Sequence, residues 1–173
     1  MARSLAQRIA RLARHRLRDH SDTHRAIPPD ALTRLAQRVA DGERGHTGEI
    51  RVYVEAALPT SYVMRDATVR DRAVAMFGKL RVWDTEHNNG VLIYLLLAER
   101  AIEIVADRGV TSRVPDSEWQ RIVGAMQGEF QAGRYEDGLA HAIAEVGALL
   151  AQHFADTPGE ADPNELPDEP VLG

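Results

Sequence analysis

Residues 88–106 read NNGVLIYLLLAERAIEIVA, and this stretch decides the fold. The run from Val91 to Leu97 is too apolar to be buried on one face only, so we expect a strand in the centre of a sheet. Glu99 and Arg100 then separate this run from residues 101–106, which have the pattern of another strand. Because so short a turn reverses the chain, the two strands should form an antiparallel hairpin.

The segment before residue 88 supplies a parallel partner for the central strand. Residues 50–55 alternate β-branched or aromatic side chains with polar ones, which is typical of a strand. Apolar side chains then recur at helical spacing from Val69 to Leu80. Strand, helix and buried strand in this order form a βαβ unit, whose crossover is right-handed and whose strands are parallel.

The remaining segments predict helices that cover the sheet. Residues 27–30 have the pattern of a helix start, and residues 116–118 cap a second helix that Gly133 ends. Residues 135–150 form a closing helix. We therefore predict an α/β fold, a three-layer α/β/α sandwich in which helices flank a small mixed sheet. The sheet contains the βαβ unit and the antiparallel hairpin strand that follows it.

The two ends of the chain carry opposite charge. Residues 1–18 contain six arginines and no acid, whereas residues 156–173 contain six acids and no base. We expect a basic amphipathic helical arm over residues 1–25 and the α/β domain over residues 26–155. Residues 156–173 should form an acidic, proline-rich, disordered tail.

The predicted arm carries an apolar stripe that needs a partner. The stripe consists of Leu5, Ile9, Leu12, Ala13 and Leu17, with arginines elsewhere on the helix. One interpretation is that the stripe docks on the domain or on a second copy of the chain. The other is that residues 1–18 bind an anionic membrane surface, which would place the protein peripherally at the inner membrane.

The composition excludes several classes of function. The chain has no cysteine, which excludes disulfides, thiolate metal sites and cysteine catalysis. No apolar run is long enough to span a bilayer and the first residues lack a signal-peptide stretch, so we expect a cytoplasmic protein. The arginines come without a helix-turn-helix or an RNA-binding motif, and we expect no nucleic-acid partner.

The predicted topology gathers polar residues at one edge of the sheet. The segments before the two parallel strands, residues 43–49 and 84–90, lie at the same edge, and the hairpin strand returns there at residues 107–109. Calcium and similar cations prefer carboxylate and amide oxygens. The candidate ligands for Ca²⁺ or another divalent cation are Asp84, Glu86, Asn88, Asn89 and Asp107, and the other polar candidates at this edge are Glu43, His46, Glu49, His87 and Arg108.

Two other interpretations of the polar residues stay open. The carboxylates at this edge could be paired with Arg44, Arg51 and Arg108, which would make the cluster structural. Open α/β sheets bind ligands at the carboxyl ends of their parallel strands. That end of the predicted sheet offers a smaller polar set, which consists of Thr60, Ser61, Tyr62, Arg65 and Asp66.

Several short motifs, taken in order, resemble the TPM domain family, which includes thylakoid-lumen acid-phosphatase-like proteins, a photosystem II repair protein and many bacterial proteins. The motifs are TGEI at residues 47–50, NGVLI at residues 89–93, Arg100 with Ile102 and Glu103 in the hairpin, and FxxGxYxxGL at residues 130–139. Residues 83–92 resemble the soluble bacterial branch in particular.

The resemblance implies an α/β sandwich and two kinds of function. Some relatives are described as acid phosphatases and some bind calcium. Asp84 and residues 88–90 match the acidic loop that precedes the buried strand in this family, while residues 107–109 replace a more glycine-rich turn. Our leading hypothesis is a noncatalytic or regulatory binding domain, assisted by a divalent cation, that acts on a protein partner or a membrane surface.

The alternative hypothesis is a metal-assisted acid phosphatase that hydrolyses phosphomonoesters. In this hypothesis Asp84, Glu86 and Asp107 hold the ion, and Arg108 holds the phosphate. His46 or His87 would transfer a proton to or from the reacting oxygen.

Overall fold

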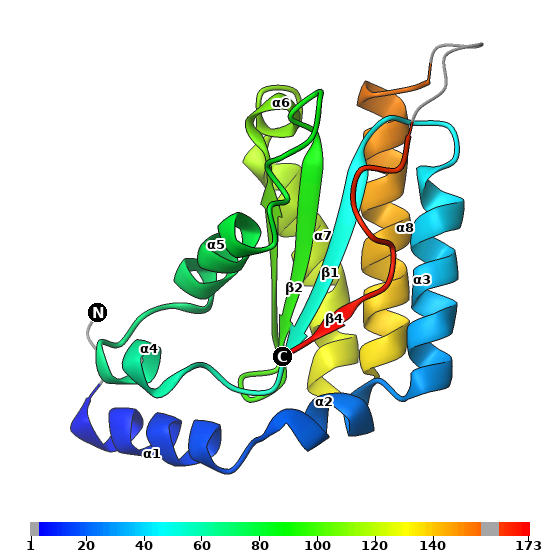
Figure 1. Ribbon diagram of the computed structural model, residues 1–173. Helices are drawn as coiled ribbons and strands as arrows, with labels where there is room; N and C mark the ends of the chain where they lie inside the picture. The colour runs from blue at the N-terminus through cyan, green and yellow to red at the C-terminus, as the bar shows by residue number, and fades with distance from the viewer. Residues whose placement is uncertain (1–3, 157–162) are drawn as a thin grey trace.

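A computed structural model describes residues 4–156 and 163–173 of the chain (Figure 1). Its elements in chain order are α1 (Leu5–Arg16), α2 (His20–Ala26), α3 (Pro29–Glu43), β1 (Glu49–Glu55), α4 (Thr60–Met64), α5 (Val69–Lys79), β2 (Gly90–Leu96), β3 (Ala101–Ala106), α6 (Arg108–Thr111), α7 (Asp116–Gln131), α8 (Tyr135–His153) and β4 (Val171–Leu172).

The strands form one mixed sheet in the order β3-β2-β1-β4. β1 and β2 pair in parallel, from Glu49 opposite Gly90 to Glu55 opposite Leu96. β2 and β3 pair antiparallel, with Ile93 opposite Ile104 at the middle of the hairpin. The α/β fold class and the mixed sheet predicted from the sequence are therefore confirmed.

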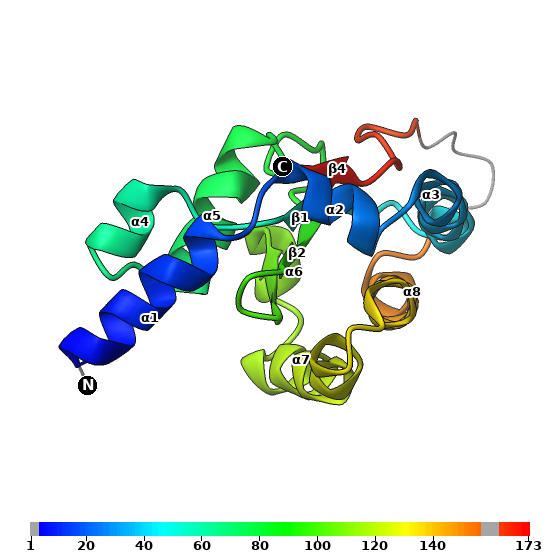
Figure 2. The same ribbon diagram turned by 90° about the horizontal axis from the view of Figure 1, so that it is seen from below.

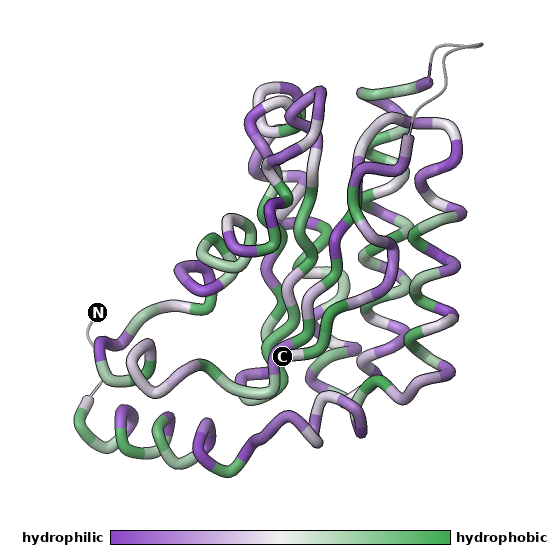
Figure 3. Tube along the Cα trace, viewed as in Figure 1, coloured by the Kyte–Doolittle hydropathy of each residue, from purple (hydrophilic) through white to green (hydrophobic). Residues whose placement is uncertain are grey.

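Helices cover the sheet on both faces, which explains why β2 is apolar at every position. In Figures 1 and 2, α3, α7 and α8 lie on one side of the strands and α5 lies on the other. Val91, Ile93 and Leu95 belong to the core cluster with α3, α7 and α8, whereas Leu92 and Tyr94 belong to the cluster with α5. Figure 3 shows the same apolar strands between helices along which hydrophobic and hydrophilic residues alternate.

The predicted disordered tail is wrong for residues 163–173. β4 extends the sheet in parallel beside β1, and the N–H of Gly173 donates to the carbonyl of Val54 at 2.8 Å. Two charged side chains of β1 hold the returning segment. The carboxylate of Glu49 accepts from the N–H groups of Glu165 and Leu166 at 3.0 and 3.1 Å, and Arg51 donates to the carbonyls of Pro167 and Glu169.

The prediction of disorder failed because the composition of a segment carries no information about the backbone groups of the domain with which that segment can pair. The outer edge of β1 presents backbone groups that need partners, and a short segment can satisfy them despite its acids and prolines. Leu166 adds a buried apolar contact, since it is only 7% exposed. The prediction for residues 157–162 lies outside the described residues.

The helical arm docks on the domain, but not through its apolar stripe. Leu5, Ile9 and Leu17 are 73%, 60% and 84% exposed, and only Leu12 packs against the core. The buried residues of α1 are Arg11 and His15, which belong to its polar side. The interpretation that the stripe docks on this domain is therefore wrong for most of its residues. No helix within the described residues is long and apolar enough to cross a membrane.

Candidate functional site

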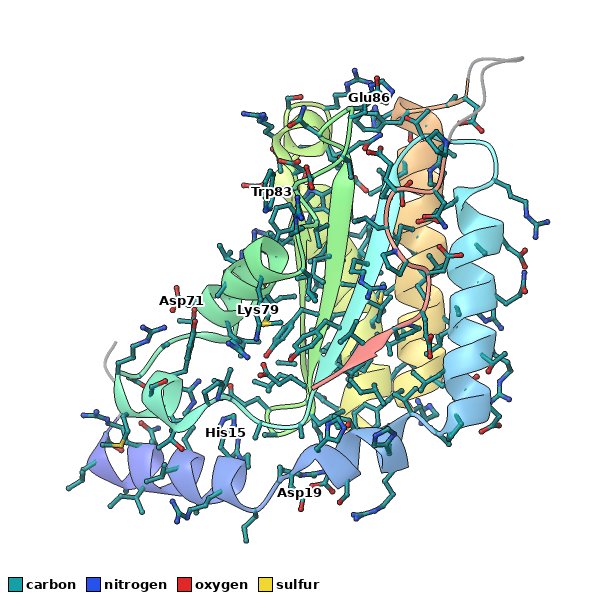
Figure 4. All side chains as sticks on the ribbon, in the orientation of Figure 1. His15, Asp19, Asp71, Lys79, Trp83 and Glu86 are labelled. Atoms are coloured by element: carbon teal, nitrogen blue, oxygen red, sulfur yellow. The ribbon has the colours of Figure 1, made fainter. Side chains whose placement is uncertain are left out.

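The predicted polar edge exists as a meeting of three chain segments at the start of β1 and β2. The N–H of Glu49 donates to the carbonyl of Asn89 at 3.4 Å, and the N–H of Asp107 donates to the carbonyl of Gly90 at 2.9 Å. The N–H of Gly109 donates to the carbonyl of Asn88 at 2.9 Å. Figure 4 shows Glu86 at this end of the molecule, far from His15 and Asp19 at the other.

Asn89 ties two of these segments together from inside the protein. Its side chain is fully buried, and its Nδ2 donates to the carbonyl and the hydroxyl of Thr47 at 2.8 and 3.0 Å. Its own N–H donates to the hydroxyl of Thr85 at 3.1 Å. Because these bonds use the amide to join two loops, Asn89 has a structural role at this edge.

The side chains around Asn89 point to separate partners. Asp84 is exposed and pairs with Arg81 at 2.5 Å, and Glu86 and His87 are also exposed. Asn88 accepts from Nε and Nη2 of Arg108 at 3.0 and 2.8 Å. Asp107 caps α6, since its Oδ1 accepts from the N–H of Arg108 at 2.6 Å. The guanidinium of Arg108 is thus bound to an amide at the surface.

The arrangement of these residues lends no support to the divalent-cation site expected from the sequence and the resemblance, which stays a prediction. Within residues 4–156 and 163–173, no three histidine or acidic side chains are grouped so that they could hold a metal ion. The arginines proposed as partners of the carboxylates contact other groups: Arg44 pairs with Asp41, Arg51 holds the C-terminal segment, and Arg108 holds Asn88.

A pocket of about 260 Å³ lies beside these loops, where the C-terminal segment crosses the end of α3. It is lined by Ala40, Glu43, Arg44, His46, Glu49, Asp156, Asn164 and Asp168. Glu43, His46 and Glu49 were predicted at this edge, and His46 is buried. Sequence reasoning missed Asp168 and Asn164 because it assigned them to a disordered tail.

Glu43 is held in its protonated form at neutral pH. Burial raises the pKa of its carboxyl group to about 8, and the nearby carboxylates of Glu49 and Asp168 act in the same direction. The N–H of Ile50 donates to its Oε1 at 2.7 Å, which opposes the shift without cancelling it. A protonated Glu43 can share a hydrogen bond with Asp168, so the pocket carries less negative charge than its residues suggest.

We expect the pH dependence of stability to change in Glu43→Gln. A raised pKa in the folded state means that the stability contribution is present below the ordinary value of 4.5 and is lost as the pH rises through about 8. Glutamine does not titrate, so the variant should gain about 1–3 kcal/mol over the parent between pH 5 and 8.5. Urea unfolding across this range measures the difference.

The matched control is Glu86→Gln, which removes an exposed carboxylate at the same edge. Because surface substitutions usually change stability by less than about 0.5 kcal/mol, its unfolding free energy at neutral pH should lie close to that of the parent. If Glu43→Gln also follows the parent, the carboxyl group of Glu43 titrates normally and the pocket is more open than described.

The alternative site at the carboxyl ends of β1 and β2 is organised around ion pairs. Arg65 lies over the ring of Tyr62 at 4.0 Å, and Asp66 pairs with Arg11 of α1 at 3.3 Å. Thr60 and Ser61 are exposed. Sequence reasoning missed Glu55 here, which is 5% exposed and binds both Arg72 and the hydroxyl of Tyr94. The alternating strand pattern gave no sign that this carboxylate points inward.

The same end of the sheet anchors α1 through a buried charge cluster. Nε of Arg11 donates to Oε1 of Glu99 at 2.7 Å, and its Nη2 donates to the carbonyl of Ala67 at 2.8 Å. The N–H of Leu58 donates to Nδ1 of His15 at 3.0 Å, so the proton of the imidazole lies on Nε2, which donates to Glu99 at 2.9 Å. Burial would raise the pKa of Glu99, but the bonds from His15 and Arg11 lower it to about 2.

Comparison with known proteins identifies the family. The model of the TPM domain matches residues 20–149. The chain belongs to the TPM domain family. The match covers most of the α/β domain and leaves α1 outside it. A search of curated proteins found no match.

Two solved structures share the TPM fold with this chain. The BA42 protein of the psychrophilic bacterium Bizionia argentinensis is 29% identical, with a TM-score of 0.74 over 85% of this chain and 95% of that protein. The N-terminal domain of a protein from P. gingivalis is 21% identical, with a TM-score of 0.61 over 76% of this chain and 83% of that domain. The second likeness shows the fold alone.

Proposed function

We propose that this TPM domain is a noncatalytic binding domain that associates with an anionic lipid surface through α1. The observation that carries the proposal is the exposure of Leu5 and Ile9 on α1 and of Leu17 directly after it, while Arg11 and His15 anchor the same helix in the domain. Exposed apolar side chains that lie together on one surface of a protein mark a site of interaction with a partner or a membrane.

The charge of α1 favours lipid as that partner. Arg8, Arg14 and Arg16 are exposed on the same helix, and residues 1–18 contain no acid. Each arginine near an anionic membrane contributes about 1 kcal/mol, and burying a leucine-sized side chain contributes about 1.5–3 kcal/mol. A second copy of the chain would bring the same positive helix to the contact, which like charges disfavour.

The anchor keeps the apolar side chains of α1 turned toward solvent. Arg11 is 4% exposed and His15 is 5% exposed, and their partner Glu99 lies in the turn between β2 and β3. The helix is therefore presented in one orientation before it meets a surface, which lowers the ordering cost of binding. The surface that we propose is the inner face of the cell membrane.

Binding to vesicles tests the proposal with a matched pair of variants. The full chain should bind vesicles of phosphatidylglycerol and phosphatidylcholine, and not vesicles of phosphatidylcholine alone. Replacement of Leu5, Ile9 and Leu17 together by glutamine should weaken binding by at least about 100-fold, since most of the apolar insertion is lost. Val74→Gln, which removes an apolar side chain that is 50% exposed on α5, should bind as the parent does.

Three outcomes of this experiment would contradict the proposal. The chain could fail to bind anionic vesicles, or the triple variant could bind as well as the parent. The parent could also sediment as a dimer while the triple variant sediments as a monomer. The apolar stripe would then contact a second copy of the chain. Repeating the assay with millimolar calcium and with a chelator tests the divalent-cation dependence that we propose from the sequence.

The metal-assisted phosphatase gains no support from the arrangement of its proposed residues. Asp84 pairs with Arg81, Asp107 caps α6 and Arg108 binds Asn88, so these groups do not converge on one point. We therefore propose a structural role for the polar edge, where Asn89 and the bonds around it hold the loops in place, and we place the binding role on α1.

A further inference from the structure

The outer edge of β3 has no neighbouring strand among the described residues. β3 is the last strand of the sheet on its side, with β2 as its only strand partner there. The N–H of Asp107 donates inward to Gly90, which fixes the alternation along the hairpin: Ala101, Glu103 and Val105 point their backbone groups at β2. The backbone groups of Ile102, Ile104 and Ala106 therefore point outward.

A groove of about 390 Å³ follows this edge between helices that belong to opposite faces of the sheet. Arg70 of α5 forms one wall, and Trp119 and Val123 of α7 form the other, with Ile104 and Ala106 on the floor. Both α5 and α7 pack against β3. The edge is thus recessed, unlike the flat open edges along which sheets join each other.

Two polar groups in the groove are available to partners from outside the sheet. Nη1 of Arg70 donates to the carbonyl of Ile104, so one outward carbonyl already bonds to a side chain. The indole N–H of Trp119 has no acceptor in the described part of the chain, although the side chain is only 9% exposed. A buried donor without an acceptor destabilises the protein, and an incoming carbonyl would supply the missing hydrogen bond.

We propose that this groove binds an extended peptide segment of a partner protein, which adds a strand to the edge of β3. The main chain of the peptide pairs with the outward groups of Ile102, Ile104 and Ala106. Side chains alternate along a strand, so the residue that faces α7 lies against Trp119 and Val123 and is apolar. One carbonyl of the peptide accepts from the indole of Trp119 after a small rotation of that ring.

The walls of the groove favour a single extended segment over a second folded copy. A second copy that paired through its own β3 would carry its α5 and α7 to the same place, and these helices would meet the helices of the first copy. A lone peptide strand has no such layers. The site also lies apart from α1, so it can be occupied while α1 contacts a surface.

Selection from a phage-displayed library of random linear peptides tests the proposal on the full chain. Selected peptides should alternate apolar and polar residues. A synthetic copy should shift the amide NMR signals of Ile102, Ile104 and Ala106 and the indole signal of Trp119. Gln120→Trp, which fills the groove from α7, should weaken binding at least about tenfold.

Gln127→Trp is the matched control, because Gln127 is exposed on the same helix but does not line the groove. It should leave the affinity of the peptide unchanged. Ala106→Pro provides a second variant, since proline removes one outward N–H of an edge strand and is tolerated there. A library that yields no binder, or a peptide whose affinity neither Gln120→Trp nor Ala106→Pro lowers, would overturn the proposal. The proposal would also be overturned if the chain forms a dimer and Ala106→Pro abolishes that dimer.

Discussion

Gly90→Ala should destabilise the domain by at least about 4 kcal/mol, and the variant will be largely unfolded if the parent is marginally stable. A Cβ atom on this residue would lie 2.0 Å from the carbonyl oxygen of Val82 and 3.0 Å from its Cγ1. Val82 is fully buried, so the loop before β2 has no open space into which it could move. Urea unfolding followed by circular dichroism measures the loss.

The cause of this effect is close approach and not backbone conformation. The φ angle of Gly90 is not positive, so an alanine at this position adopts its backbone dihedral angles without strain. Gly78→Ala is the matched control, since nothing lies within 4 Å of the added atom and the residue belongs to α5. Replacing a helical glycine with alanine should stabilise the protein by up to about 1 kcal/mol.

If the free energy of unfolding of Gly90→Ala is within about 1 kcal/mol of that of the parent, the loop from Val82 to Asn89 can shift outward. The polar edge would then be adaptable, and the bonds of Asn89 to Thr47 could not be essential to it. The expected loss of stability in Gly90→Ala would instead explain why asparagine and glycine occupy residues 89 and 90. The asparagine joins the loops, and the glycine lets the loop before β2 pass close to the strand.

The central part of the fold could be predicted because its signals are local. Each residue from Val91 to Leu96 is buried, and a strand covered on both faces must be apolar at every position. The short turn at Glu99 and Arg100 allows only a hairpin. The meeting of three segments at the polar edge follows from these strand directions alone, without any knowledge of side-chain contacts.

The rest could not be predicted because it depends on partners far away in the chain. The apolar stripe of α1 suggested that this side docks, yet Glu99 lies 84 residues from His15 and draws the polar side inward. Glu49 and Arg51 likewise hold a segment that is more than 100 residues away. Hydrophobic periodicity does not report on a buried charge cluster, because each member looks like a surface residue by itself.

Glu99→Ala should release α1 from the domain. The substitution leaves Nε of Arg11 and Nε2 of His15 without their shared acceptor, although both side chains are about 95% buried. Removing one partner of a buried pair typically costs about 3–5 kcal/mol. Arg11 keeps its contacts with Asp66 and the carbonyl of Ala67, so we expect a loss near the lower end, about 3 kcal/mol.

Hydrogen exchange measures this release at the amides of α1. A loss of about 3 kcal/mol in docking should speed exchange by about 100-fold over residues 9–16, while the amides of β2 should keep their protection. Glu136→Ala is the matched control, because its carboxylate pairs with Arg34 at the surface of the domain and its removal should cost less than 1 kcal/mol.

The same variant distinguishes the anchoring of α1 to the domain from the binding of α1 to lipid. A released α1 keeps Leu5, Ile9 and Leu17, so Glu99→Ala should still bind anionic vesicles. Its affinity should fall, since the helix must now be ordered at the membrane. If exchange in α1 stays slow in this variant, the contact with α4, where Arg8 donates to the carbonyl of Met64, holds the helix without the charge cluster. The buried charges would then serve only to choose which side of the helix faces the domain.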